Sequence, residues 1–226
     1  AGTTWAMVEG GQPPVELDYE LNSLGINRFH DTLDGPFTAH PKYDVSTGEL
    51  HSVNYHWPDL IDHVNYTVVG GDGRVTKNVA IPVADMPMMH DMSLTEKYVV
   101  VYDLPVTVNM DVLVAGYAFP FKWNNDRAAR VGLLPRNGAA DDVIWCDVDP
   151  CYVFHPLNAY VDGNVVVCDV GRHATMSMEP EVYTPPAHLH RWTFDLASGA
   201  VNEQRIDERT HAFSRVDDRV VGLPHR

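Results

Sequence analysis

The sequence predicts an all-β protein. Helical periodicity is almost absent from the 226 residues, and short runs of β-branched and aromatic residues recur instead. Turn residues separate these runs, and glycine beside aspartate or asparagine supplies the positive φ angles that tight hairpin loops need. A succession of hairpins of this kind is typical of an antiparallel propeller or barrel.

The predicted strands share two features, β-branched or aromatic side chains and turn residues at their ends. They are 37–43, 50–55, 64–69, 74–82, 98–108, 143–148, 152–160, 165–170 and 188–196. The turn sequences DVSTGE, GGDG and VDGN join three neighbouring pairs of these strands into hairpins. Segment 116–141 has no strand pattern, so we expect a crossing loop with a short helical turn there, forming part of a ligand entrance.

The charge balance excludes some classes of partner. The chain has 31 acidic and 16 basic residues, which gives a formal net charge of -15. A nucleic-acid-binding protein needs a basic face for the phosphates, so we expect no nucleic acid partner. Binding to anionic lipid by charge alone is disfavoured for the same reason, whereas peripheral membrane contact through apolar side chains stays open. The sequence predicts no protein partner.

Cysteine usage indicates the compartment. Cys146, Cys151 and Cys168 are odd in number and lack the repeating spacing of a disulfide framework. This favours a reducing compartment, and we expect a cytoplasmic protein. No apolar run approaches the roughly 18 residues needed to cross a bilayer.

Histidine usage gives the first indication of chemistry, since the chain holds 12 of them. His51, His56 and His63 lie among polar residues, and we expect them to face water. His188 and His190 are two positions apart, which places them on one face of a strand as a solvated or packed pair. None of these has the short spacing that a helix or knuckle imposes on a zinc motif.

His40, His90 and His155 lie in a different context. Each stands at the edge of an apolar strand and precedes a proline or an aspartate. One such histidine alone is best explained as a core residue bonded to a backbone carbonyl. Three of them on separate hairpins favour a central metal, because a barrel or propeller brings strand ends together, and neutral imidazole is a suitable ligand for iron, zinc or copper. For Asp91, beside His90, a turn cap is favoured over a catalytic base.

Four segments carry a resemblance to a known family. They are FTAHPKYDVSTGEL, MPMMHDMSLTEKYVVVYDLPV, FHPLNAYVDGNVVVCDV and RWTFDLASGAVNEQRIDERTHAFSRVDDRVVGLPHR. Together they resemble the carotenoid cleavage oxygenases, the group that also holds lignostilbene dioxygenases and retinoid isomerohydrolases. The resemblance implies a seven-bladed β-propeller with antiparallel blades, whose axis holds a non-haem Fe(II) bound by four histidines.

The resemblance also implies which residues would bind iron. His40, His90 and His155 match the first three ligands, and the fourth belongs to a motif beyond Arg226. His225 matches a segment that does not bind the metal. Residues 1–226 therefore resemble an internal fragment, a partial propeller domain whose N-terminal and C-terminal blades are missing.

Glutamates orient the iron-bound histidines in that family, and Glu9 matches the first of them. The segment that usually reads Glu-Phe-Pro-Arg is AFSR here, so Ala212 stands in place of the glutamate and Ser214 in place of the proline. A water molecule or Glu208 would have to compensate; otherwise this copy is impaired. Val8 stands where the stilbene-cleaving members commonly have lysine, which favours carotenoids or apocarotenoids as substrates.

The resulting hypothesis is an Fe(II) dioxygenase that adds O2 across one C=C bond of an apolar polyene to give two carbonyl products. No arrangement of Ser, His and Asp or of paired carboxylates competes with it. Two alternatives remain open. One is a lignostilbene-type dioxygenase, and the other is a degenerate, non-catalytic propeller fragment.

Overall fold

The computed structural model describes residues 3–8, 10–117, 119–177 and 183–225, and every strand pair among them is antiparallel. Its only α-helix in these ranges is α1 (Met110–Val114), a single short turn. The prediction of an all-β protein is confirmed. Within the described part of the chain, no helix has the length and the apolar composition that crossing a bilayer would require.

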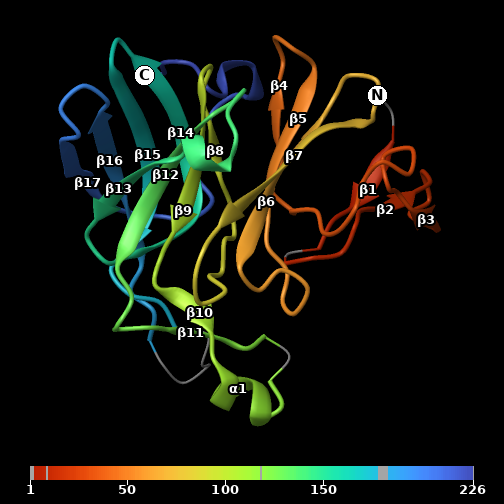
Figure 1. The fold of residues 1–226 in the computed structure, drawn as a ribbon, viewed down its shortest axis with the longest axis horizontal. Helices are drawn as coiled ribbons and strands as arrows, with labels where there is room; N and C mark the ends of the chain where they lie inside the picture. The colour runs from red at the N-terminus through yellow and green to blue at the C-terminus, as the bar shows by residue number, and fades with distance from the viewer. Residues whose placement is uncertain (1–2, 9, 118, 178–182, 226) are drawn as a thin grey trace.

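Three four-stranded sheets make up most of the molecule and stand side by side in Figure 1. The first has the order β4 (Lys42–Asp44), β5 (Glu49–Asn54), β6 (His63–Val69) and β7 (Val75–Pro82). The second has the order β8 (Ser93–Leu94), β9 (Tyr98–Asp103), β12 (Ala129–Pro135) and β13 (Ile144–Val148). The third has the order β14 (Tyr152–Asp162), β15 (Val165–His173), β16 (Ala187–Asp195) and β17 (Val201–His211).

Smaller elements flank these sheets. The N-terminal sheet of β1 (Thr4–Ala6), β2 (Val15–Leu17) and β3 (Ser23–Ile26) lies at one side, beyond the first four-stranded sheet (Figure 1). Strands β10 (Val106–Val108) and β11 (Phe121–Trp123) form a two-stranded sheet. Helix α1 lies between them in the chain and stands at the lower end of the molecule in Figure 1. Two 3-10 turns, η1 (Ala140–Asp142) and η2 (Asp218–Val220), complete the described elements.

Valine-rich strands form the core. Val99, Val100 and Val101 of β9 are completely buried, and they belong to one apolar cluster that also contains Tyr66 and Trp192 from the neighbouring sheets. Strands buried on both faces read as continuous apolar runs, which is why β9 shows no alternation. The three cysteines are free thiols.

The predictions for segments 37–43, 98–108 and 116–141 differ from the structure, and strands β1, β2, β3 and β8 were not predicted. Segment 116–141 contains β11 and β12 rather than a crossing loop, because β12 gains its order from pairing with β9 and β13 on both sides. The predicted strand 98–108 is divided between β9 and β10, which belong to different sheets. Of the predicted strand 37–43 only Lys42 and Tyr43 are in β4.

The first strands of the three sheets lie close together and position the candidate site. Strand β8 contacts β14. Lys42, which begins β4, bonds through its ammonium group to Asp91, just before β8, with an Nζ–Oδ1 distance of 2.7 Å. The segments that enter these strands therefore converge on one region.

Candidate metal centre

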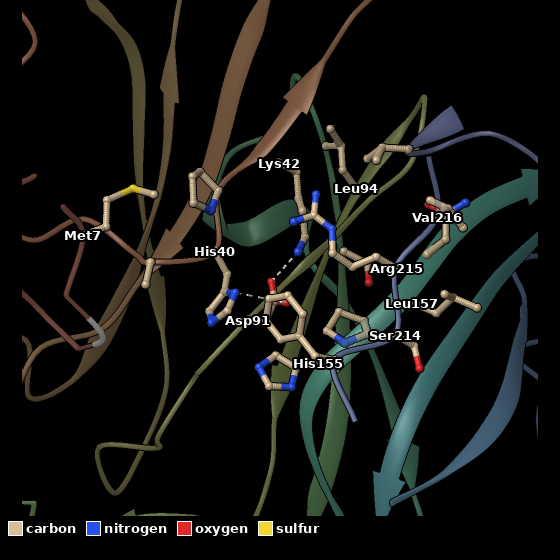
Figure 2. Close-up of a pocket in the computed structure, with 17 residues that line it drawn as sticks. Met7, His40, Lys42, Asp91, Leu94, His155, Leu157, Ser214, Arg215 and Val216 are labelled. Atoms are coloured by element: carbon tan, nitrogen blue, oxygen red, sulfur yellow. Dashed lines mark ion pairs between the residues drawn. The ribbon is translucent and has the colours of Figure 1, made fainter. Parts of the chain in front are cut away.

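The structure brings His40, His90 and His155 together. One ring nitrogen from each lies within 4.8 Å of the other two. The Nε2 atoms of His90 and His155 are 3.1 Å apart, and the ring of His40 is centred 4.6 Å from that of His90 and 5.2 Å from that of His155. Figure 2 shows the rings of His40 and His155 close to each other in the wall of one cavity.

Local backbone features aim these side chains. His155 lies in β14 between two irregularities in its pairing with β15, at Val153/Pro156 and at Pro156/Asn158. Pro156 cannot donate to the ladder, and such a bulge bends the strand and redirects a side chain. The segment that carries His40 is fixed by Thr38, whose hydroxyl accepts from the His40 backbone N–H at 3.1 Å.

The cluster is electrostatically suited to a cation. Burial, followed by the nearby His90, the ammonium of Lys42 and His173, lowers the pKa of His155 to about 4. His155 is therefore neutral at ordinary pH and offers a nitrogen lone pair, which a metal ligand must do. The ring planes are inclined by 41°, 65° and 77° to one another, so the rings are not stacked.

The spacing of the nitrogens also fits a metal ion. Two nitrogens bound to one ion at right angles, each at about 2.1 Å, would be about 3 Å apart, close to the separation of the His90 and His155 Nε2 atoms. The donor set, three imidazoles with no carboxylate among them, suits iron, zinc or copper.

A buried ion pair lies beside the cluster. Asp91 accepts from the Met92 backbone N–H at 2.6 Å and from Lys42 Nζ at 2.7 Å, and its Oδ2 is 4.0 Å from His40 Nδ1 (Figure 2). Burial raises the pKa of Asp91 to about 6, against the opposing effect of Lys42. This bond runs to the next residue along the chain, and Asp91 does not lie in a turn.

Two cavities adjoin His155. The larger, about 240 Å³, also has His40, Lys42 and Asp91 in its wall (Figure 2). The smaller, about 160 Å³, lies where Ala212 stands, and its wall includes His173 and His211. Phe213 borders both, and its ring packs edge-on against His155 with the centroids 4.5 Å apart.

The other residues singled out from the sequence lie in various places. Glu9 is outside the described residues, and Val8 is exposed. Glu208 does not compensate for Ala212, since its side chain is 87% exposed and pairs with Arg205 at 2.8 Å. The expected solvent exposure of His51 was wrong, because that side chain is buried.

The remaining histidines considered from the sequence are not assembled into a site. His56 and His63 pair with the neighbouring acids Asp59 and Asp62 at 2.9 Å and 2.6 Å. His190 Nδ1 donates to the His188 backbone carbonyl at 3.0 Å, next to an irregularity between these residues in the pairing of β16 with β17.

A second group of potential ligands was missed from the sequence. Asp44, Glu49 and His51 lie within 4.8 Å of one another. The Arg136 guanidinium occupies the space between them, 2.7 Å from Asp44, 3.1 Å from Glu49 and 2.9 Å from His51 Nε2. The Tyr66 hydroxyl is 2.9 Å from His51 Nδ1. The guanidinium already bonds all three side chains, so we assign no metal to this group.

An all-β scaffold with a three-histidine cluster between its sheets defines the class of protein, a β-protein with a candidate metal centre on its inner strands. Residues 1–226 match the family described as retinal pigment epithelial membrane protein (RPE65). The chain belongs to this family, and the family predicted from the sequence is confirmed.

Named relatives include carotenoid-cleaving and lignostilbene-cleaving proteins. The carotenoid cleavage oxygenase of Mycobacterium tuberculosis is 40% identical over 272 residues, covering 100% of this chain and 54% of the relative. Carotenoid 9,10(9',10')-cleavage dioxygenase 1 of Phaseolus vulgaris is 29% identical over 237 residues, with coverage of 100% and 43%.

Among solved structures, the lignostilbene dioxygenase of Pseudomonas brassicacearum superimposes with a TM-score of 0.86 at 31% identity, covering 99% of this chain and 49% of that one. The chain spans about half the length of the relatives it matches.

Proposed function

We propose that this chain is an internal portion of a non-haem Fe(II) dioxygenase that cleaves a conjugated C=C bond of a carotenoid or apocarotenoid with O2, giving two carbonyl products. The observation that carries the proposal is the convergence of His40, His90 and His155 from three separate segments. A fourth histidine, outside the chain, would complete the ligand set. Residues 1–226 would form a partial domain of a seven-bladed propeller.

The residues present fit such an ion. His40, His90 and His155 would hold it through ring nitrogens, and the lowered pKa of His155 keeps that ring neutral. Iron(II), when bound, supplies the redox chemistry that O2 needs to react with a polyene. Phe154 and Phe213 pack against the rings of His90 and His155. The protein's contribution is thus the positioning of the reacting groups.

The substrate class rests on weaker support. Val8 cannot pair with the phenolate of a hydroxystilbene, and two of the named relatives cleave carotenoids. The likeness to a lignostilbene dioxygenase supports the second candidate, cleavage of a stilbene C=C bond.

We also propose a cytoplasmic protein with peripheral membrane contact. Met110, Val114 and Tyr117, on and just after α1, are exposed apolar side chains at one end of the molecule (Figure 1). Apolar side chains gathered on an exposed helical turn suit contact with a bilayer surface, which would also give access to an apolar polyene.

Metal content and product formation test the function. The full-length protein that carries this chain should bind about one iron per chain, consume O2 with an apocarotenal and release two carbonyl products, as measured by metal analysis, an oxygen electrode and mass spectrometry. A variant with His155→Ala is the matched control. Iron well below one per chain would favour the non-catalytic alternative, and cleavage of a hydroxystilbene but not the apocarotenal would favour the stilbene candidate.

A further inference from the structure

We propose that His173 positions His155 for metal binding, through an ordered water molecule in the smaller cavity that both rings line. His173 would thereby supply the hydrogen-bond acceptor that Ala212 cannot provide. The inference rests on the proposed function, because it assigns to His173 a role toward the metal that His40, His90 and His155 would hold.

The two ring nitrogens of His155 have different surroundings. Nε2 faces the cluster, 3.1 Å from His90 Nε2. When Nε2 binds a metal, Nδ1 carries the ring proton and needs an acceptor, and such an acceptor fixes the tautomer and the ring plane. Among the residues that the structure describes, none accepts a hydrogen bond from Nδ1. Ala212 has no polar side-chain atom, and Glu208 points to solvent in its pair with Arg205.

The smaller cavity provides the space for a mediating group. Its volume of about 160 Å³ exceeds what one water molecule needs. Its wall combines apolar and imidazole groups and is made by Phe154, His155, Gly171, His173, Ala187, His211, Ala212, Phe213 and Ser214. A water molecule needs polar partners to be ordered, and the imidazoles are the titratable groups in this wall.

His173 has the right hydrogen-bonding capacity. Its Nδ1 lies 2.7 Å from the Pro185 carbonyl oxygen, and since a carbonyl only accepts, Nδ1 carries the proton. With that proton on Nδ1, the ring can accept at Nε2, for which the described part of the chain offers no protein donor. The chain of bonds runs from His155 Nδ1–H to water, and from water to His173 Nε2.

Packing holds the two rings in this relation. The ring of Phe154 lies next to both, 5.4 Å from His173 in an edge-to-face contact and 6.2 Å from His155. An aromatic neighbour of this kind limits rotation of both imidazoles. The Pro185 carbonyl fixes the far side of His173.

His211, the other imidazole in the cavity wall, is engaged elsewhere. Its Nε2 lies 3.1 Å from the Asp207 carboxylate, which can only accept, so Nε2 carries the proton. Its Nδ1 lies 3.4 Å from the Ser214 hydroxyl. Because both nitrogens have partners, His211 is the matched control for His173, in the same cavity and of the same chemistry.

The test uses the full-length protein and Co2+ as a spectroscopic probe. The visible absorption of bound Co2+ gives the dissociation constant without any need for turnover. We expect His173→Ala to weaken binding about 10–100-fold, the usual effect of losing a group that orients a metal ligand. His173→Gln keeps an acceptor oxygen and should stay within about 3-fold of the wild type. His211→Asn should also stay within about 3-fold, because His211 does not orient a ligand and only the loss of an orienting group weakens metal binding in this way.

A second measurement separates positioning from a general structural effect. In the metal-free protein, the ring 15N shifts of His155 report which nitrogen is protonated. The wild type and His173→Gln should show Nδ1–H, and His173→Ala a mixture of tautomers. Ala212→Glu should remove the dependence on His173, so that Ala212→Glu/His173→Ala binds Co2+ at least as tightly as the wild type.

Three outcomes would overturn the inference: unchanged Co2+ affinity in His173→Ala, an equal loss in His211→Asn, or an equal loss from His173→Ala when Ala212→Glu is present. Each of them leaves the proposed function standing, because the wild type still binds the metal. A wild-type protein that binds no Co2+ overturns the proposed function and this inference with it.

Discussion

Two clusters in this molecule group three potential metal ligands within the same 4.8 Å limit, yet they differ in what lies between the ligands. In the first, the ring nitrogens of His40, His90 and His155 lie together, and His40 and His155 line the larger cavity. In the second, the Arg136 guanidinium fills the space between Asp44, Glu49 and His51. The identity of the ligands alone does not make a metal site, because lone pairs that already accept from a cationic donor are not available.

The two clusters also differ in the charged groups that surround their buried histidines. Both His155 and His51 have a pKa lowered to about 4, chiefly by burial. Around His51 one arginine, Arg136, pairs with two carboxylates, Asp44 and Glu49. Around His155 the nearest charged pair, Lys42 and Asp91, is neutralised internally. A divalent cation would therefore meet a competing guanidinium at the second cluster and three imidazoles at the first.

Removing one ligand from each cluster should give the largest contrast. His155→Ala in the full-length protein should lower metal affinity more than about 100-fold, the upper range for loss of even an outer partner of a ligand. Glu49→Gln should leave the metal content unchanged. Metal analysis after dialysis against a weak chelator measures both, and loss of metal in Glu49→Gln would show that the second cluster is the real site.

Replacing Arg136 in the second cluster should lower the free energy of unfolding of the protein. Arg136→Met leaves two carboxylates and a buried imidazole without their common donor, and we expect a loss of about 3–5 kcal/mol in the free energy of unfolding, measured in urea. Lys77→Met is the control, since its ammonium bonds the backbone carbonyls of Arg136 and Gly138 rather than the carboxylates. An equal loss in both variants would contradict a specific role for the guanidinium.

These two clusters show which residues stand out in a sequence. His40, His90 and His155 each stand beside an apolar run of the sequence, and an imidazole in such a place is conspicuous. Arg136 and its three partners were invisible, because they come from β4, β5 and the end of β12 and their local sequence is that of ordinary polar residues. Contacts between distant polar residues leave no periodic signal.

The local sequence also explains which strands were predicted and which were missed. Hairpins such as β14–β15 were predictable, since Gly163 has a φ of 58° in a tight turn between two strongly patterned strands. Strand β12 was missed because its sequence ARVGLLP has good helix formers and little alternation. Only the partners β9 and β13 decide that it is a strand.

Lowering the pH should reduce the free energy of unfolding, because His51 is buried in its neutral form. Its pKa is about 4 in the folded protein against an ordinary value of 6.5, so the unfolded chain binds the proton more readily. Stability from this group is complete above about pH 6.5 and is lost as the pH falls toward 4, by about 3 kcal/mol in total. Urea midpoints of the wild type and His51→Asn should converge as the pH is lowered across this window. Parallel curves would place the pH dependence elsewhere.

The smallest effect should come from Glu208, the one carboxylate near Ala212 that the sequence offered as a replacement partner. Its ion pair with Arg205 is 87% exposed on the glutamate side, and exposed pairs contribute about 0–1 kcal/mol. Glu208→Gln should therefore leave Co2+ affinity within about 2-fold of the wild type, because the exposed Glu208 side chain orients no metal ligand. A larger loss would mean that Glu208 turns inward in the full-length protein and orients His155, which would remove the need for His173.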